Sequence, residues 1–150
     1  MSVLTSIQGR TTYLDTNIFI YFLEDYAPFA PSLAPLFHEI ESGRQPSITS
    51  ALTLAEVLVA PFRAKDAAAI KAYQEALKSR RGFTLVPVTE PILVESARVR
   101  AEYSSLRLPD AIYFATAALS GCSVFLTNDR RFSSGLGIEV VVLSNLLQST

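Results

Sequence analysis

Residues 11–23 read TTYLDTNIFIYFL, and the organisation of the whole chain follows from this segment. Its first four residues are β-branched, aromatic or apolar, which favours a β-strand. Thr16 and Asn17 are residue types that begin helices, and the apolar letters IFIYFL suit a buried helix. Asp15 therefore stands between the end of a strand and the start of a helix. Ligands bind at this edge of parallel sheets, and a carboxylate is costly to bury alone, so we expect Asp15 to have a partner.

Strand and helix patterns alternate along the rest of the chain. Strands are expected over residues 11–14, 46–50, 83–88, 124–129 and 138–143. Helical patterns lie between them, including a long polar one over residues 64–81, and the residues expected to end helices are Gly43, Pro61, Gly82 and Gly121. The last strand is apolar apart from Glu139, which predicts burial on both of its faces. This alternation is typical of the α/β class, with a parallel sheet inside a three-layer domain.

The length and composition suit one compact domain. We expect residues 1–10 to be a loose lead-in and residues 11–150 to form a single domain. Apolar residues make up 49% of the chain and the mean hydropathy is +0.29, which indicates that a partner covers some apolar surface. The net charge is −1, so any binding of nucleic acid depends on a local basic patch.

The sequence has no feature of a membrane or secretory protein. No apolar run approaches the roughly 18 residues that span a bilayer, and the opening MSVLTSIQGR does not have the pattern of a signal peptide. Cys122 is the single cysteine, so an intramolecular disulfide is impossible, which suits a reducing compartment. We therefore expect a cytoplasmic protein.

Four acidic residues stand in apolar segments or at strand ends. Asp15 and Asp129 each follow a strand pattern. Glu56 and Asp110 lie within the apolar segments ALTLAEVLVA and LPDAIYFATAAL. Each acid has a structural alternative: a turn or helix cap for the strand-end pair, a capping box with Thr53 for Glu56, and a place in the first helical turn for Asp110. Gathered in one cleft, the four would repel and raise one another's pKa values. A divalent cation removes this conflict, and oxygen ligands favour Mg²⁺ or Mn²⁺ over zinc.

The sequence resembles the PIN-domain nucleases, and within them the VapC-type ribonuclease toxins of toxin–antitoxin pairs. The matching segments occur in the order of the family: LDTNIFI, ITSALTLAEVL, LPDAIYFATAAL and LTND. The resemblance implies a parallel five-stranded sheet flanked by helices and a metal-dependent endoribonuclease. It assigns the acidic roles, and the ligands of Mg²⁺ or Mn²⁺, to Asp15, Glu56, Asp110 and Asp129. The chain departs from the family in its lead-in, residues 1–10.

The ligand set suggests a mechanism of hydrolysis. Asp15 and Asp110 are expected to contact the metal most directly. The other two acids would hold it directly or through water. The metal polarises the scissile phosphate and activates a water, and one carboxylate takes the proton of that water. We expect support for the site from Asn17, Ser50 and Thr127, although the same three residues fit ordinary helix-cap or strand roles.

Basic residues give the indication of a substrate. Arg130 and Arg131 directly follow Asp129, so they either contact RNA phosphates or are solvated loop charges. His38 is the only histidine, which excludes a ribonuclease that needs a pair of histidines as acid and base. The family resemblance implies an RNA substrate, a VapB-like antitoxin partner and a homodimer.

Other classes of α/β protein lack their own motifs here. An aspartyl phosphatase needs a second aspartate where Asn17 stands, and a receiver domain needs a lysine near the last strand. A dinucleotide-binding module needs a glycine-rich phosphate loop, which DTNIF is not. Two alternatives to the ribonuclease stay open: a protein-interaction domain that keeps the acids without turnover, and a structure-specific DNA nuclease.

Overall fold

The computed structural model describes residues 2–147. Five strands form one parallel sheet in the order β3-β2-β1-β4-β5. The bounds of the strands are β1 Thr12–Leu14, β2 Ser47–Ser50, β3 Phe83–Val86, β4 Val124–Thr127 and β5 Glu139–Val142. The predicted parallel five-stranded sheet is confirmed, and the first strand of the chain lies at its centre.

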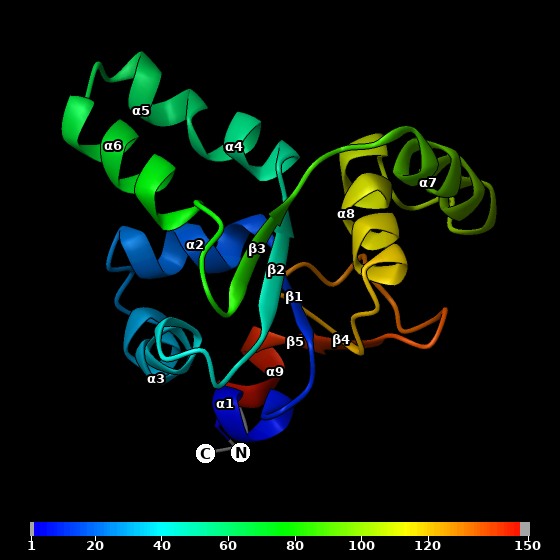
Figure 1. Cartoon of the computed structure of the whole chain (residues 1–150), viewed down its shortest axis with the longest axis horizontal. Coiled ribbons are helices and arrows are strands. Elements are labelled where there is room, and N and C mark those ends of the chain that lie inside the picture. The colour runs from blue at the N-terminus through cyan, green and yellow to red at the C-terminus, as the bar shows by residue number, and fades with distance from the viewer. Residues whose placement is uncertain (1, 148–150) are drawn as a thin grey trace.

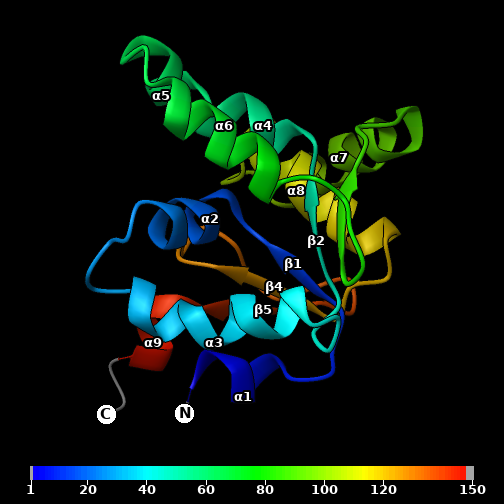
Figure 2. The ribbon, with the colours of Figure 1, turned by 60° about the vertical axis from the view of Figure 1, so that its left-hand side comes forward.

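Helices cover both faces of the sheet, as the three-layer prediction requires. Their bounds are α1 Val3–Ile7, α2 Thr16–Leu23, α3 Ala30–Glu41, α4 Leu52–Val57, α5 Val59–Arg63, α6 Ala67–Ala76, α7 Glu90–Glu102, α8 Leu108–Leu119 and α9 Leu143–Leu147. Helices α7 and α8 lie on one side of the sheet, and α1, α2, α3 and α9 lie on the other (Figure 1). Helices α4, α5 and α6 project beyond the end of the sheet where β2 ends (Figure 2).

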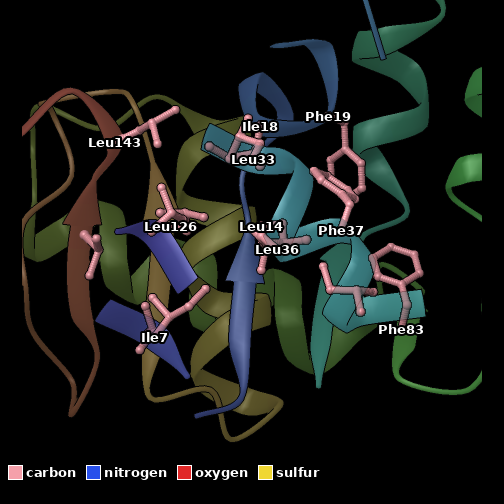
Figure 3. Close-up of a cluster of buried hydrophobic side chains, with 14 of the residues drawn as sticks. Ile7, Leu14, Ile18, Phe19, Leu33, Leu36, Phe37, Phe83, Leu126 and Leu143 are labelled. Carbon is pink, nitrogen blue, oxygen red and sulfur yellow. The ribbon is translucent and has the colours of Figure 1, made fainter. Parts of the chain in front are cut away.

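Alternating side chains of the central strands supply two hydrophobic cores. Leu14 of β1 and Leu126 of β4 point toward α2 and α3, where they pack in one cluster with Leu33 and Leu36 (Figure 3). Tyr13, which precedes Leu14, belongs to the opposite core, and its ring stacks on its cross-strand partner Phe125 with centroids 4.7 Å apart. Burying one such side chain stabilises the fold by about 1.5–3 kcal/mol. The two cores therefore fix the central strands, and the residues that follow those strands are held in place with them.

The expectation of a loose lead-in was wrong. Residues Val3–Ile7 form α1, and the Ser2 hydroxyl caps the helix by accepting from the Thr5 amide at 3.1 Å. Val3 and Ile7 are fully buried in the same core as α3. These two apolar residues are four positions apart, so one face of a single helical turn carries both of them inward.

Two helix boundaries also differ from expectation. Pro61 does not end a helix, because α4 already ends before Leu58 and a new helix, α5, starts at Val59. Pro61 thus falls in a first turn, where its missing N–H has no partner to lose. The polar helix expected over residues 64–81 is shorter, since the Asp66 side chain caps α6 by accepting from the Ala69 amide at 3.0 Å.

The last strand is not buried on both faces, which corrects the expectation from its apolar sequence. β5 lies at an edge of the sheet beside β4. Val141 is buried, whereas Val140 and Val142 are only partly buried. The order of strands, which hydrophobic periodicity does not reveal, determines this exposure. No helix within residues 2–147 is long and apolar enough to cross a membrane.

Candidate active site

Asp15 lies at the carboxyl end of the central strand and begins α2. Its backbone amide donates to the Leu126 carbonyl of β4 at 3.0 Å, which ties it to the neighbouring strand. One carboxylate oxygen, Oδ1, caps α2 by accepting from the Thr16 amide at 2.9 Å. The other, Oδ2, accepts from the Thr127 hydroxyl at 2.6 Å. Asp15 is only 6% exposed. Hydrogen bonds to both carboxylate oxygens hold its side chain in place.

The protonation of Asp15 reflects burial and neighbouring acids. The pKa of this carboxyl is raised from 3.8 to about 6. Loss of solvent is the largest cause, and the charges of Asp129 and Glu56 also raise it. The hydrogen bonds from Thr127 and Thr16 act in the opposite direction, because they favour the charged form. Asp15 therefore interacts electrostatically with two of the other candidate acids, Asp129 and Glu56.

Glu56 reaches the same cluster from α4. Its Oε1 accepts from the Thr16 hydroxyl at 3.3 Å and from the Tyr113 hydroxyl of α8. Its pKa is raised, first by loss of solvent and then by the charge of Asp110, while the hydrogen bond from Thr16 lowers it. The capping box considered for Glu56 does not form, since the Thr53 hydroxyl is buried and pairs with Thr49 at 3.0 Å.

Asp110 and Asp129 are bridged by one guanidinium group. Arg131 places Nη2 at 2.5 Å from Asp129 Oδ2 and Nη1 at 3.2 Å from Asp110 Oδ2. The hydrogen bonds from Arg131 hold the pKa of the Asp129 carboxyl below its usual value. In return the pKa of Arg131 is raised, first by its hydrogen bond to Asp129 and also by the charges of Asp110 and Asp15. The guanidinium thus lies within the field of three of the four acids.

Capping and clustering are compatible roles for these acids. Asp110 Oδ2 accepts from the Arg107 amide at the start of α8 at 3.0 Å, and its Oδ1 lies 3.4 Å from Arg131. Asp129 Oδ1 accepts from the Arg131 amide at 2.9 Å, which closes a turn after β4. The structural alternatives foreseen for Asp15, Asp110 and Asp129 therefore hold as well. The caps fix each carboxyl group at the edge of the sheet that the cluster shares.

The residues expected to support the site, and the basic residue beside it, have different surroundings. Thr127 is fully buried and joins Asp15 to the Asp129 amide, which donates to the Thr127 hydroxyl at 2.9 Å. Ser50 is also buried, but its hydroxyl accepts from the Leu52 amide and so starts α4. Asn17 is in the first turn of α2, and its Oδ1 is buried without a hydrogen-bond partner among the described residues. Arg130 is exposed on the loop beside Arg131.

Two contributing residues were not predicted from the sequence. Thr16 and Tyr113 both donate to Glu56. Tyr113 follows Asp110 by three positions on α8, so the two side chains share one helical face, and this spacing was the signal available. Thr16 was assigned only to the start of a helix, although it directly follows Asp15.

The donor set fits a hard divalent cation. Every candidate ligand is a carboxylate or hydroxyl oxygen. The pKa values of Asp15 and Glu56 are raised by burial and by neighbouring acidic charges, and a bound cation would oppose this rise. The buried Oδ1 of Asn17 adds an acceptor without a donor near Asp15 in the sequence. Within residues 2–147 no three acidic, histidine or cysteine side chains converge into one coordination shell. Arg131 stands between two of the acids, so holding a cation requires side-chain rotation.

Comparisons with known proteins agree with the fold. The model of the PIN domain family matches residues 12–135, which include all four acids. The comparison with curated proteins gave no match. Among solved structures, the chain is similar to one in a toxin–antitoxin complex from Klebsiella pneumoniae, with 27% identity and a TM-score of 0.64. That alignment covers 87% of this chain and 96% of the other.

Two further structures share the fold at lower identity. One is VapBC2 from Rickettsia felis bound to a DNA fragment from its promoter, with 14% identity, a TM-score of 0.67, and coverage of 88% of this chain and 98% of the other. The other is DNA-bound VapBC from Salmonella typhimurium, with 20% identity, a TM-score of 0.62, and coverage of 89% and 98%.

Proposed function

The chain belongs to the PIN domain family, and we propose that it is a metal-dependent endoribonuclease, the toxin of a toxin–antitoxin pair. The observation that carries the proposal is the meeting of four carboxylates from four separate segments at one edge of the sheet. They come from the end of β1, from α4, from α8 and from the loop after β4. Family membership makes nucleic acid the expected substrate class, and the solved relatives that are toxin–antitoxin complexes support the toxin role.

The residues that would hold the cation are Asp15, Asp110, Glu56 and Asp129, and the ion would be Mg²⁺ or Mn²⁺. When bound, it supplies Lewis acidity to the scissile phosphate and to a water that attacks phosphorus in line. Thr127 holds Asp15 Oδ2 in place, and Thr16 and Tyr113 hold Glu56 Oε1, which orients these acids before substrate arrives. One carboxylate takes the proton of the attacking water. Arg130, exposed beside the cluster, contacts an RNA phosphate.

RNA cleavage with defined metal content tests the enzyme assignment. The purified chain should cut RNA with Mg²⁺ or Mn²⁺ and not with EDTA. Asp15→Asn and Asp110→Asn keep the shape of each side chain and remove a negative ligand, so each should lower the cleavage rate by at least about a hundredfold. The control is Glu102→Gln, which alters an exposed acid at the end of α7 and should cut like the parent.

The same assay separates the two alternatives. A structure-specific DNA nuclease would cut branched or single-stranded DNA of matched length and leave RNA intact. A protein-interaction domain without turnover would cut neither substrate with any divalent ion, and Asp15→Asn would leave its partner binding unchanged. Cleavage of RNA that survives both Asn substitutions would overturn the assignment of the acids.

We also propose an antitoxin partner and a cytoplasmic location. The solved relative at 27% identity is a toxin–antitoxin complex, and two structures of the same fold are VapBC complexes on DNA. The test is co-purification with the protein encoded beside this chain, followed by the RNA cleavage assay. We expect that protein to bind the chain and to suppress cleavage. A neighbour that binds nothing and inhibits nothing would remove the toxin role while leaving the nuclease proposal standing.

A further inference from the structure

Arg131 is the residue whose contacts the proposed chemistry leaves unexplained. The sequence suggested that it contacts RNA or solvent, but its guanidinium is turned toward the acids. Its Nε donates to both carboxylate oxygens of Asp129 and its Nη2 donates to Oδ2, and it also pairs with Asp110. Its side chain remains 42% exposed, so it enters the cluster from the solvent side.

This guanidinium lies between two of the candidate metal ligands. Asp110 and Asp129 are two of the four candidate ligands, and Arg131 neutralises both of them at once. Asp15, the most buried acid, also lies within its field. The planar guanidinium presents several N–H donors that fit carboxylate oxygens, so arginine can make these contacts and lysine cannot make them in the same way.

We infer that Arg131 is an internal competitor for the divalent cation: it pairs with Asp110 and Asp129 until the metal displaces its guanidinium, and it thereby sets the metal affinity of the site. This inference rests on the proposed metal-dependent function. The displacement requires only a side-chain movement. The backbone of Arg131 stays anchored, because its amide donates to Asp129 Oδ1 at 2.9 Å.

The physical balance between the two cations supports displacement. Ion pairs that reach solvent are weak, because water and salt screen them and because a long side chain loses freedom when it is held. A divalent ion carries twice the charge and would take oxygen ligands from the candidate acids beyond the two that Arg131 pairs with. Once displaced, the guanidinium lies next to the loop of Arg130, on the side from which an RNA phosphate would approach.

Mn²⁺ binding measured by titration calorimetry on the purified chain tests this inference without reference to activity. Arg131→Gln removes the competing charge and should tighten Mn²⁺ binding by about tenfold, the size expected for loss of a small ion-pair network. Arg130→Gln is the matched control, since it removes the same charge from the adjacent loop position, and it should change the affinity less than about twofold. Arg131→Lys keeps the positive charge but lacks the planar set of guanidinium donors, so it should give an intermediate Mn²⁺ affinity.

Each outcome bears on the inference. Unchanged Mn²⁺ affinity in Arg131→Gln, with tight binding by the parent, overturns the competition and leaves the nuclease proposal intact. Weaker binding in Arg131→Gln also overturns it, because Arg131 would then support the ligands rather than compete for them. Failure of the parent and of every Arg131 variant to bind Mn²⁺ overturns the inference together with the metal-dependent function. If Arg131→Gln does not fold, as judged by circular dichroism, the comparison of Arg131→Lys with the parent decides the question.

Discussion

Asp15 uses its two carboxylate oxygens for different purposes. Oδ1 satisfies the first amide of α2, and Oδ2 receives the Thr127 hydroxyl at the centre of the cluster. Asp110 and Asp129 likewise each accept from a backbone amide and also pair with the Arg131 guanidinium. At each position the local fold and the site therefore depend on the same carboxyl group. Replacing such an acid by Asn keeps the capping acceptor and removes the charge, which makes Asn the informative substitution.

The ionisation of Asp15 should weaken the fold as pH rises. Its pKa is about 6 in the folded chain and 3.8 in the unfolded reference, so the unfolded chain releases this proton first. The folded state then binds more protons between about pH 4 and pH 6, and stability falls through that window before becoming level. Asp15→Asn removes this fall, so its free energy of unfolding should rise relative to that of the parent by about 3 kcal/mol between pH 4 and pH 7.

Urea unfolding of both proteins in EDTA across this pH range provides the measurement. The difference between the two curves reports the titration of Asp15 together with its coupling to Glu56 and Asp129, because the remaining titrating groups are common to both proteins. Added Mn²⁺ at pH 7 should stabilise the parent and have little effect on Asp15→Asn, as ligand linkage requires. A difference that does not change with pH would show that Asp15 keeps an ordinary pKa.

Tyr113 should orient Glu56 rather than merely fill space. Tyr113→Phe keeps a ring that is 2% exposed and removes only the hydroxyl that donates to Glu56 Oε1. We expect the cleavage rate to fall about tenfold, the effect of losing one hydrogen bond to a charged group, with the stability changed by less than about 1 kcal/mol. In a Glu56→Gln background the same substitution should have little further effect, because the two residues act as one unit. Equal losses in both backgrounds would assign Tyr113 to packing; Tyr26→Phe, at an exposed tyrosine, is the control.

The sequence singled out the four acids as candidate site residues, but it did not determine their contacts. Asp15 and Asp129 follow strand patterns, so adjacency of β1 and β4 in a parallel sheet brings them together. The bridge made by Arg131 depends on how a four-bond side chain folds back across its own loop, which residue spacing does not determine. The contact between Tyr113 and Glu56 joins residues 57 positions apart and depends on the packing of α8 beside α4.

At the scale of elements, the interior of the sheet was easier to predict than its margins. Strands β1 and β4 are apolar and central, so the pattern and the burial agree. β5 is equally apolar but lies at the edge, where one side has no neighbouring strand. Pro61 shows the same limitation for helices. A proline in an apolar segment predicts the end of a helix, unless it is known that a new helix has just begun after Leu58. In both cases the missing information is the arrangement of neighbouring elements.

Helix α1 should contribute measurably to the stability of the fold. Ile7 is fully buried and belongs to the core that contains Leu33 and Leu36. Ile7→Ala should lower the free energy of unfolding by about 2–5 kcal/mol, because it removes buried methyl groups and leaves a cavity. Gln8→Ala, at the exposed end of the same helix, should change it by less than about 0.5 kcal/mol. Equal, small effects of both substitutions in urea unfolding would mean that α1 is peripheral.

At the scale of the whole molecule, the distribution of charge leads us to expect that, under the proposed function, the metal ion binds before RNA. The chain has 13 basic and 14 acidic residues, so its overall field gives RNA no general attraction. Four of the acids lie together at the edge of the sheet, and without a compensating cation they would repel a phosphate. Arg131 compensates for only part of this charge, since its contacts are with Asp110 and Asp129. Under the proposed function, the divalent ion would therefore serve the approach of the substrate as well as its cleavage.

The apolar surface of the molecule predicts a homodimer. Large apolar side chains are exposed on two separate parts of the chain: Val94 of α7 is 67% exposed and Phe62 of α5 is 58% exposed. Leu119 at the end of α8 is 53% exposed and lines the same hollow as Val94. Light scattering at micromolar concentration should give twice the chain mass of 16.4 kDa. Asp15→Asn is a suitable background for this measurement, because it should remove the toxicity expected of the active chain.

Two charged substitutions then test which apolar surface the copies share. Val94→Glu and Phe62→Glu each place a carboxylate on one of these surfaces, and an unpaired charge is costly to bury in an interface. Because a two-fold dimer buries the same surface on both copies, one substitution introduces the charge twice and should convert the dimer to a monomer. The other substitution should leave the mass unchanged and serves as the control for folding. A mass of 16.4 kDa for the parent throughout the micromolar range would contradict the dimer, and a dimer that survives both substitutions would exclude these two surfaces as its interface.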